Sequence, residues 1–298
     1  MLLPIICSDC KIEKLYYSQI IAIKGLIGGY AWVNASRPIS PIKNGVTKPY
    51  IINCSGDEYV VKFLENPEGH KALINEFVCA KLAKLVNLPL AEPVLINVSD
   101  EFLIDHGEEL NQSIGNQIQP GIHFGTKKIK KVVPINSTSI VKRASNKNII
   151  ASIILFDHII CNKDRDSNGG NLIYDFKQEE IVVIDHTHAF DIGPIWNSHQ
   201  LKIRIGETIE PFDMTGYLYN KLIPFIDGYN PFADVLYYLG LVNEDHLMDI
   251  MYEIPNSWDI SNEEKEVLTE YLMDRIKRRG EILDYLKPVL PNWKGGGA

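Results

Sequence analysis

The stretch from Ile153 to Phe190 constrains the fold more than any other, because it joins an apolar helix to a β-hairpin through a polar loop. An almost unbroken apolar run over residues 153–160 predicts a buried helix. Two β-prone runs follow, at residues 171–174 and 181–184, and a short polar turn separates them. The open end of the predicted hairpin therefore carries polar side chains next to the loop.

Carboxylate and amide side chains occupy this loop and the ends of the hairpin. Asn171 begins the first strand and Asp185 follows the second, whereas Asp164 and Asp166 lie in the loop. Phosphoryl transfer uses such a set, in which one carboxylate orients the attacking oxygen while an amide and a second carboxylate hold magnesium. The alternative is a polar turn in which Asp, Asn and Gly are only turn formers. That alternative does not explain an acid at the end of the second strand.

The spacing within the loop allows two assignments of the catalytic carboxylate. Arg165-Asp166, with Asn171 five residues after the aspartate, fits the kinase pattern R-D-x-x-x-x-N literally. In a second register Asp164-Arg165 opens the loop and Asp166 only follows it. In both registers Asp185 takes the place of the metal-binding aspartate that begins D-F-G in protein kinases, although here the sequence continues with H-T.

These motifs resemble the catalytic and metal-binding loops of the HipA-like kinases. The resemblance is carried by N-K-D-R at residues 162–165, by Asn171-Leu172 and by I-D-H at residues 184–186. It implies a relationship to the phosphatidylinositol kinases and a bilobal, protein-kinase-like α+β fold with a β-rich N-lobe and a mainly helical C-lobe. It extends thinly over residues 36–279.

The resemblance also implies that the first aspartate of D-R is catalytic, which is Asp164 in this chain. Literal spacing and family pattern thus disagree by two residues, and we favour Asp164. Asp164 directly follows the predicted helix, whereas Asp166 begins a segment whose glycines loosen the backbone. A base that must be positioned belongs on the better fixed part of the loop. Asp166 and Arg165 remain further candidate catalytic residues.

A lysine and a glutamate nearer the N-terminus form a second candidate set. Residues 50–53 and 58–63 are predicted to form a hairpin whose second strand carries Lys62. An apolar stripe predicts a helix over residues 71–86, with Glu76 beside the stripe. Kinases use such a lysine–glutamate pair to hold the α- and β-phosphates of ATP. The alternatives are a solvated edge-strand lysine and an ordinary surface acid.

Three weaker signals concern anions. Ser36 and Arg37, which precede Pro38, resemble the phosphate-loop region of the HipA-like branch, although Asn34-Ala35 stand where glycines are expected. The glycines within residues 25–29 could cover phosphates or form a plain turn. The lysines of residues 127–131 could attract an acidic substrate or form a solvated face, and we favour the solvated face.

The remaining segments suggest how the lobes are divided. The prediction is an N-lobe over residues 1–105, a connecting segment 106–147, a helical C-lobe 148–294 and a tail 295–298. Within these parts we expect a hairpin of residues 93–98 and 101–104, a loop over 106–119, and helices over 213–222, 231–239, 244–252 and 263–285. Ser261 and Glu264 form a predicted capping box.

Composition limits the classes of function. The chain of 298 residues has 30 basic and 38 acidic side chains, and a net charge of −8 argues against a general nucleic-acid binder. No apolar run approaches the roughly 18 residues that span a bilayer. Residues 1–7 lack the basic start of a signal peptide, and the odd number of cysteines shows no repeated spacing. We therefore expect a cytoplasmic protein with reduced cysteines and no membrane partner.

A histidine group follows the hairpin. His186, His188 and His199 could suggest zinc, but an H-x-H with one distant partner is poor ligand spacing. Core or supporting histidines are the favoured interpretation.

The sequence thus predicts a phosphotransferase that uses ATP and Mg2+. Lys62 would grip the phosphates, Glu76 would hold Lys62, and Asn171 and Asp185 would bind Mg2+. The resemblance implies a serine or threonine acceptor on a protein, and autophosphorylation is expected. The alternatives are a lipid or small-molecule kinase and a catalytically weak kinase-like module that binds a partner, such as an antitoxin protein.

Overall fold

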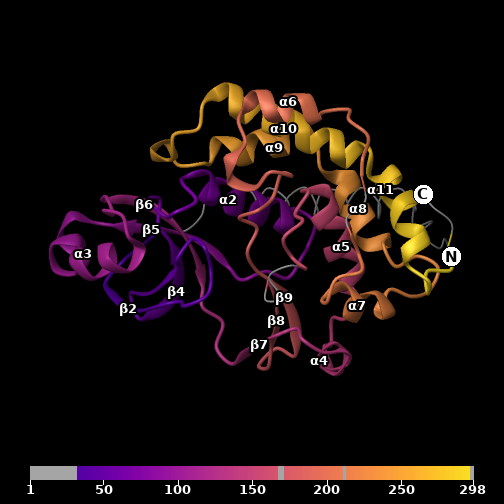
Figure 1. Cartoon of the computed structure of the whole chain (residues 1–298), viewed down its shortest axis with the longest axis horizontal. Helices are drawn as coiled ribbons and strands as arrows, with labels where there is room; N and C mark the ends of the chain where they lie inside the picture. Colours follow the sequence, from indigo (N-terminus) through magenta and orange to yellow (C-terminus); the bar gives the residue numbers. More distant parts are fainter. Residues whose placement is uncertain (1–31, 167–170, 211–212, 296–298) are drawn as a thin grey trace, which may run out of the picture.

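A computed structural model describes residues 32–166, 171–210 and 213–295. The glycines of residues 25–29, the segment 167–170 and the end of the predicted tail lie outside the described residues. Figure 1 shows two lobes side by side, a β-rich lobe formed by the N-terminal part and a helical lobe formed by the C-terminal part. The described part of the chain is therefore α+β and bilobal, as the sequence predicts.

The N-lobe is built on a six-stranded sheet. In the order β1-β5-β6-β4-β3-β2 its strands are Trp32–Asn34, Pro93–Val98, Gly121–Lys127, Asp57–Lys62, Tyr50–Cys54 and Arg37–Pro41. Strand β1 runs parallel to β5, and the other neighbours are antiparallel. The predicted hairpin corresponds to β3 and β4, and β4 lies between two neighbours rather than at an edge.

Helix α3 (Asp100–Ile114) corrects the predicted strand over residues 101–104 and the first part of the predicted loop over residues 106–119. Ser99 is the N-cap, because its side chain accepts a hydrogen bond from Phe102 N, and two acids follow in the first turn. Such caps and charges stabilise a helix start. The helix ends at Gly115, whose backbone is left-handed. The β-prone residues Phe102, Leu103 and Ile104 belong to this amphipathic helix. The predicted hairpin of residues 93–98 and 101–104 is therefore wrong.

The antiparallel partner of β5 is β6, and this pairing moves the lobe boundary. Residues 121–127 lie in the N-lobe sheet between β5 and β4. The N-lobe therefore extends to about residue 127, and residues 106–127 are not part of a connecting segment. The sequence did not show this pairing because it joins strands separated by all of α3.

Helix α2 (Lys71–Leu85) lies where the two lobes meet (Figure 1). Thirteen of its 15 residues are buried, so it is covered on nearly all sides and not only along the predicted stripe. Two ion pairs tie it to the C-lobe, Lys81 with Glu253 after α9 and Lys71 with Glu264 in α10. The ring of Phe77 also packs edge-on against Trp258 at 5.7 Å.

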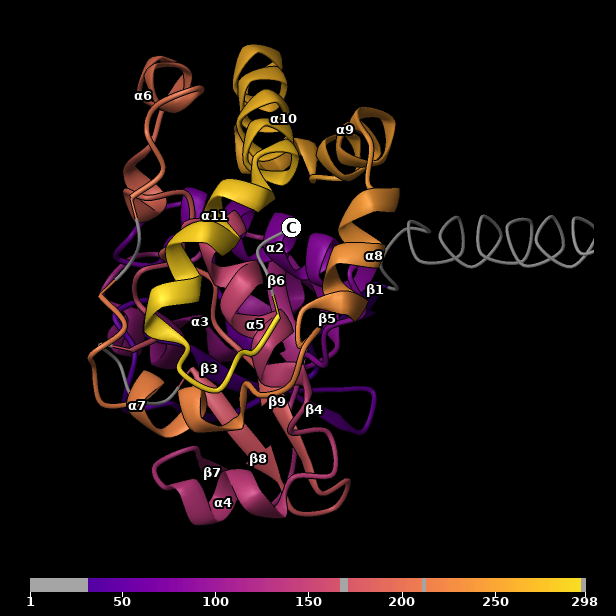
Figure 2. The ribbon, with the colours of Figure 1, turned by 90° about the vertical axis from the view of Figure 1, so that its right-hand side faces the viewer.

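The C-lobe surrounds α5 (Ile149–Ile159). Its residues 150–159 are all buried, and Figure 2 shows it between α8 and α11. The other helices are α4 (Thr138–Arg143), α6 (Ser198–Arg204), α7 (Tyr219–Leu222), α8 (Ala233–Leu241), α9 (Glu244–Tyr252), α10 (Asn262–Lys277) and α11 (Arg279–Leu286). Short 3-10 turns are η1 (Gly193–Ile195), η2 (Ile223–Phe225), η3 (Asn256–Trp258) and η4 (Lys287–Val289). No described helix is long and apolar enough to cross a membrane.

Two predicted helices change in extent. The capping box of Ser261 and Glu264 is present, but the helix it begins ends at Lys277, and α11 then starts a new axis. The predicted helix 213–222 is reduced to α7.

A three-stranded sheet beside α5 supports the catalytic loop. Its strands, in the order β7-β8-β9, are Val132–Pro134, Leu172–Asp175 and Glu180–Val183. Leu172 pairs with Val183, so the predicted hairpin forms in the expected register. Val183 N also donates to Pro89 O at 2.8 Å, which fastens the hairpin to the segment after α2.

Candidate active site

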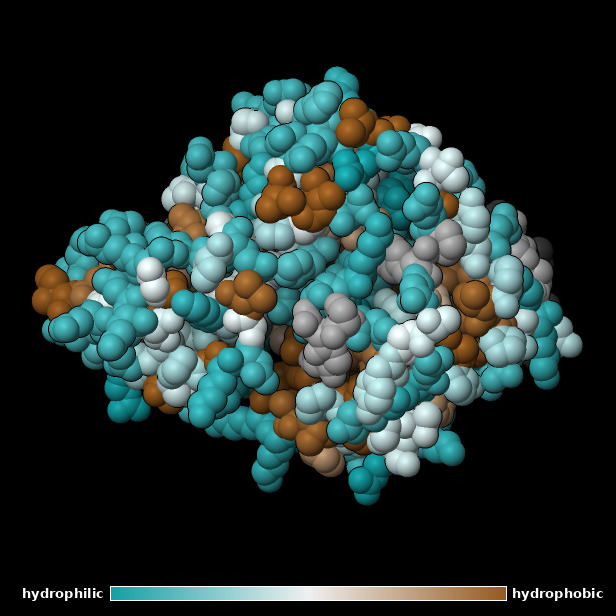
Figure 3. Space-filling model, viewed as in Figure 1, coloured by the Kyte–Doolittle hydropathy of each residue, from teal (hydrophilic) through white to brown (hydrophobic). Residues whose placement is uncertain are grey.

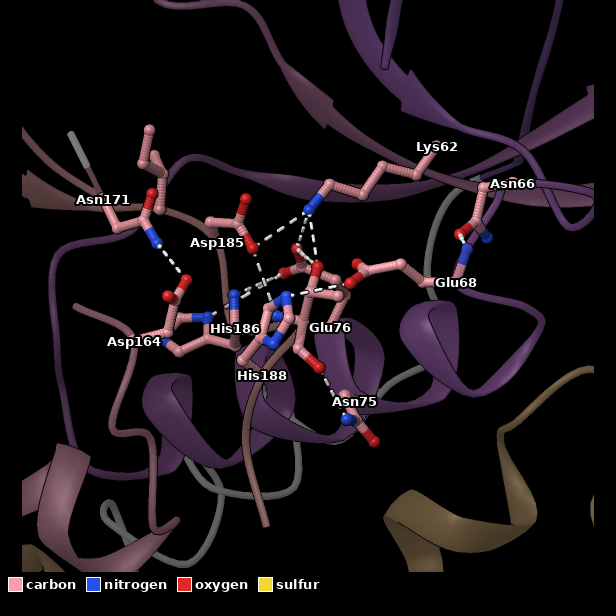
Figure 4. Close-up of polar contacts among 12 residues, drawn as sticks. Lys62, Asn66, Glu68, Asn75, Glu76, Asp164, Asn171, Asp185, His186 and His188 are labelled. Atoms are coloured by element: carbon pink, nitrogen blue, oxygen red, sulfur yellow. Dashed lines mark hydrogen bonds and ion pairs between the residues drawn. The ribbon is translucent and has the colours of Figure 1, made fainter. Parts of the chain in front are cut away.

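A buried cluster around Lys62 joins the two lobes (Figure 4). Lys62 ends β4, and its Nζ contacts Glu76 Oε1 on α2. The same nitrogen donates to Thr187 Oγ1 at 2.8 Å and lies 3.1 Å from Asp185 Oδ1. Lys62 is 7% exposed and Glu76 4%, so neither is the surface residue of the alternative interpretation. The structure therefore brings three of the predicted site residues together.

The charges in this cluster oppose the effect of burial. Burial by itself lowers the pKa of Lys62, but the carboxylates of Asp185 and Glu76 outweigh it and raise that pKa. Burial raises the pKa of Glu76 despite its contact with Lys62. Burial also acts to raise the pKa of Asp185, yet the Lys62 ammonium and the Thr187 N–H hold it well below its ordinary value. Asp185 is therefore ionised at neutral pH.

Side chains of α2 hold the backbone that carries Asp185. His186 N donates to Glu76 Oε2 at 3.1 Å, and Asn75 Nδ2 donates to Thr187 O at 2.7 Å. Thr187 N donates to Asp185 Oδ1 at 3.1 Å. Asp185 has a φ of 58°, a left-handed conformation that costs a non-glycine residue about 1 kcal/mol or more. The surrounding hydrogen bonds offset this strain and fix the direction of the carboxylate.

Arg165 anchors the catalytic loop in the interior. Its guanidinium is fully buried and donates from Nε and Nη2 to the two carboxylate oxygens of Asp157 on α5. Its Nη1 donates to Asn171 O at 2.6 Å and to Ile184 O at 3.2 Å. The bidentate pair with Asp157 fixes Arg165 on α5. Through Nη1, Arg165 also holds the start of β8 and the end of β9. The sequence pointed to Arg165 but not to its partner Asp157.

Asp164 and Asn171 meet on the side of Asp185 that faces away from Lys62 (Figure 4). Asn171 Nδ2 lies 3.4 Å from Asp164 Oδ2, and both residues are half-buried. Ile184 N donates to Asn171 O at 3.2 Å, so Asn171 and Asp185 both lie at the open end of the hairpin. The arrangement of carboxylate, amide and second carboxylate that the sequence predicts is present.

Asp166 has different neighbours from Asp164. Its Oδ1 accepts hydrogen bonds from the backbone N of Leu218 at 2.6 Å and of Tyr219 at 3.0 Å. A Cβ atom at Gly216 would overlap with Asp166 Oδ2, so this segment packs directly on the carboxylate. Asp166 thus fastens the start of α7 to the catalytic loop.

Residues 36–37 lie at the opposite end of the sheet from Lys62. Arg37 pairs with Asn53, which pairs with Glu58 near the start of β4. Glu58 is four residues before Lys62, which corresponds to about 13 Å along a strand. Ser36 and Arg37 are therefore not brought to the cluster, and their prediction as cofactor-binding residues is corrected. The turn at the Lys62 end of these strands is formed by residues 42–49.

The lysine run that begins at the last residue of β6 is partly neutralised by the N-lobe itself. Lys127 pairs with Asp57 at 2.8 Å and Lys128 with Glu58 at 2.7 Å. Lys130 and Lys131 are exposed. These contacts favour a solvated face over an anion site.

One contact at the edge of the cluster has no local signal in the sequence. His188 Nε2 lies 3.1 Å from Glu68 Oε1, in the segment between β4 and α2. His186, by contrast, is buried edge-on to Phe156 at 5.9 Å, and burial lowers its pKa to about 3. Within the described ranges no three His, Cys, Asp or Glu side chains gather into a metal site.

The two lobes and the Lys62–Glu76 pair between them define a protein-kinase-like fold. A family model described as HipA-like kinase matches residues 37–201, which is more than half of the chain. The chain belongs to the HipA-like kinase family. Family and fold together support a phosphotransferase.

A solved structure with a TM-score above 0.5 supports the fold. A Helicobacter pylori proinflammatory kinase, CtkA, superposes with a TM-score of 0.52 at 14% identity, covering 87% of this chain and 99% of that one. A Golgi casein kinase with Mn/ADP bound gives a TM-score of 0.44 at 12% identity, with 91% and 76% covered. No curated protein matches the sequence.

Proposed function

We propose that this protein is a kinase that uses ATP and Mg2+ to transfer the γ-phosphate to a hydroxyl group. The observation that carries the proposal is the buried Lys62 shared by Glu76 and Asp185. Taking a lysine out of water is unfavourable unless it is paired, and kinases use such a pair to bind phosphates.

The residues present fit a magnesium-bound nucleotide. Mg2+ prefers oxygen ligands and usually takes one or two carboxylates together with substrate phosphates. Asp185 offers an ionised carboxylate whose side chain is 32% exposed, and Asn171 offers an amide oxygen at the same end of the hairpin. When bound, Mg2+ neutralises charge on the β- and γ-phosphates. Figure 3 shows hydrophobic residues gathered over β7–β9 between the lobes, a surface suited to a flat base.

Asp164 is the proposed acceptor for the proton of the attacking hydroxyl. Transfer forms the bond between the hydroxyl oxygen and the γ-phosphorus and breaks the bond from that phosphorus to the bridging oxygen of ADP. The proton passes to Asp164 Oδ. The contact of Asp164 with Asn171 supports this role over Asp166, whose Oδ1 holds the start of α7. Arg165 is proposed as a positioning residue, because its donors face the interior.

The acceptor is proposed to be a serine or threonine of a protein, including this chain itself, and the setting is proposed to be cytoplasmic. The motifs shared with the family support a protein acceptor, although lipid and small-molecule kinases use the same machinery. A kinase-like module that binds a partner such as an antitoxin, with weak activity, would have little need for the ionised Asp185.

Two measurements test the proposal. The chain is incubated with γ-labelled ATP and Mg2+, and phosphate incorporation into the chain or an added protein is followed. In parallel, Mg-ATP should raise the melting temperature, because a ligand at 100 times its Kd adds about 2.7 kcal/mol to the free energy of unfolding. Asp185→Asn should lose the magnesium-dependent part. An unchanged melting curve at millimolar Mg-ATP together with no incorporation would refute the kinase function.

A further inference from the structure

Thr187 contacts all three charged side chains that meet at Lys62. Its Oγ1 accepts a hydrogen bond from Lys62 Nζ at 2.8 Å and donates one to Glu76 Oε1 at 3.1 Å. Its backbone N donates to Asp185 Oδ1 at 3.1 Å. Thr187 is 2% exposed, and Asn75 Nδ2 on α2 donates to its carbonyl oxygen at 2.7 Å. One buried residue therefore connects a lysine, a glutamate and an aspartate that come from three different segments.

The hydroxyl of Thr187 has no counterpart in the kinase motif D-F-G. The chain reads D-H-T at residues 185–187, so Thr187 stands at the position that glycine takes in D-F-G. A glycine there offers only its backbone. A hydroxyl both accepts and donates hydrogen bonds, which lets Thr187 contact an ammonium group and a carboxylate at the same time. The contacts with Lys62 and Glu76 therefore depend on this chain's own form of the motif.

The ammonium group of Lys62 has three N–H donors, and three protein oxygens face it. They are the charged Glu76 Oε1 and Asp185 Oδ1 (Figure 4) and the neutral Thr187 Oγ1. A phosphate oxygen that binds Lys62 must replace one of them. Glu76 and Thr187 are buried, whereas the side chain of Asp185 is 32% exposed and is the proposed ligand of Mg2+. Asp185 is thus the partner that Lys62 can exchange for a phosphate.

Such an exchange requires other contacts that keep Lys62 in place. The lysine side chain is flexible, so one contact alone does not fix the direction of its ammonium group. Thr187 Oγ1 supplies a second contact, and it also donates to the same oxygen of Glu76 that Lys62 contacts. The three groups form a closed set of hydrogen bonds, which holds the ammonium group when Asp185 is exchanged. The backbone N of Thr187 meanwhile stays on Asp185 Oδ1.

We propose that Thr187 is a positioning residue for phosphoryl transfer, whose hydroxyl holds Lys62 beside Glu76 for the phosphates of ATP. The inference rests on the proposed kinase function and adds a residue on which nucleotide binding depends. Thr187 takes part in no bond that forms or breaks, because it acts only through Lys62.

The first experiment compares Thr187→Val with Thr269→Val. Both remove the hydroxyl of a buried threonine and keep the shape of the side chain; Thr269 Oγ1 donates to Lys265 O at 2.9 Å within α10. Thr187→Val should raise the Kd for Mg-ATP about 10-fold, the effect of losing one hydrogen bond to a charged group. Thr187→Ser, which keeps the hydroxyl, and Thr269→Val should both bind Mg-ATP like the parent. The Kd follows from the rise in melting temperature with Mg-ATP concentration.

The second experiment asks whether Thr187 acts through Lys62. In Lys62→Met the hydroxyl has no ammonium group to hold, so adding Thr187→Val should not raise the Kd for Mg-ATP further. A residue that only supports the fold would raise the Kd by the same factor in both backgrounds, because independent effects add in free energy. The double variant thus separates positioning of Lys62 from general support.

The outcomes distinguish this inference from the kinase function. The role of Thr187 is refuted, while the kinase function stands, if Thr187→Val binds Mg-ATP like the parent or if Thr187→Ser does not restore binding. The same holds if Thr269→Val loses as much affinity, or if Thr187→Val has its full effect in the Lys62→Met background. If Mg-ATP leaves the melting curve of the parent unchanged and no phosphate is incorporated, both proposals are refuted.

Discussion

The two halves of the candidate site are held in different ways. Around Lys62, the side chains of Glu76 and Asp185 are already paired with it, and the lysine and glutamate are almost inaccessible to solvent. Asp164 and Asn171 are half-buried, and the 3.4 Å between them is at the long end for a hydrogen bond. The proposed nucleotide half (Lys62, Glu76 and Asp185) is thus preorganised in its side chains, whereas the side chains of the proposed transfer half (Asp164 and Asn171) are held more loosely to each other.

The transfer half is nevertheless fixed through its backbone. Arg165 and Asp157 hold the carbonyls of Asn171 and Ile184 from the interior. Side-chain pairs therefore hold the part of the site that we propose binds the nucleotide, whereas backbone contacts hold the part that we propose accepts the proton. Each of the following substitutions removes a side chain that holds or forms one of the two halves.

Asp164→Ala should give the largest effect, because it removes the proposed proton acceptor from the transfer half. We expect kcat to fall by about 1000-fold or more, with Mg-ATP binding retained. Asp166→Ala should mainly lower the melting temperature, since it removes two hydrogen bonds from the start of α7. Single-turnover transfer and calorimetric binding measure both. The reverse order of activities would place the acceptor at Asp166.

Arg165→Met should destabilise the whole C-lobe, because it leaves the carboxylate of Asp157 buried without its partner. Breaking a buried pair in this way costs about 3–5 kcal/mol in the free energy of unfolding. Arg278→Met, which breaks pairs at the surface of α10 and α11, should cost less than about 1 kcal/mol. Urea unfolding compares the two. Similar losses would show that Arg165 does not anchor the loop.

Lys62→Met should affect the nucleotide half alone. We expect about a 100-fold loss in kcat/KM for ATP, because the proposed phosphate-binding cation is removed. Transfer to the acceptor from any nucleotide that still binds depends on Asp164 and is retained. Lys127→Met removes an exposed lysine that pairs with Asp57 and is the matched control. If Lys62→Met used ATP like the parent, Lys62 would hold the lobes together without binding phosphate.

A smaller effect concerns acid. A carboxyl group whose pKa is lower in the folded protein adds stability above its unfolded pKa of about 3.9, and loses this contribution as pH falls through its folded pKa. Asp185 is in this class because of Lys62. In Lys62→Met the cation that lowers the pKa of Asp185 is missing, so the variant lacks this contribution at pH 7. The parent loses the same contribution in acid, so the difference in free energy of unfolding between parent and variant should shrink below about pH 4. Urea unfolding at pH 7 and pH 3 tests the sign, and a difference independent of pH would contradict it.

Local signals determined a large part of the fold. The apolar run before the loop gave α5, and the alternation around the polar turn gave β8 and β9 in register, which placed Asn171 and Asp185 together. Strand β4 and helix α2 followed from similar patterns and positioned Lys62 and Glu76. Helix α3 had a local signal as well, because Ser99 caps it and two acids follow in its first turn. Its β-prone residues nevertheless favoured a strand in the sequence-based prediction.

The sequence could not decide matters that depend on partners far along the chain. Both aspartates of the loop fit a motif, and only the packing of α7, 52 residues after Asp166, shows what Asp166 binds. The sheet register alone moved Ser36 and Arg37 away from Lys62. The sequence by itself determined which residue types and local elements form a site, because periodicity and turn chemistry act within a few residues. Only the tertiary structure decided which side chains meet, such as His188 with Glu68, because burial and charge pairing act between segments that folding brings together.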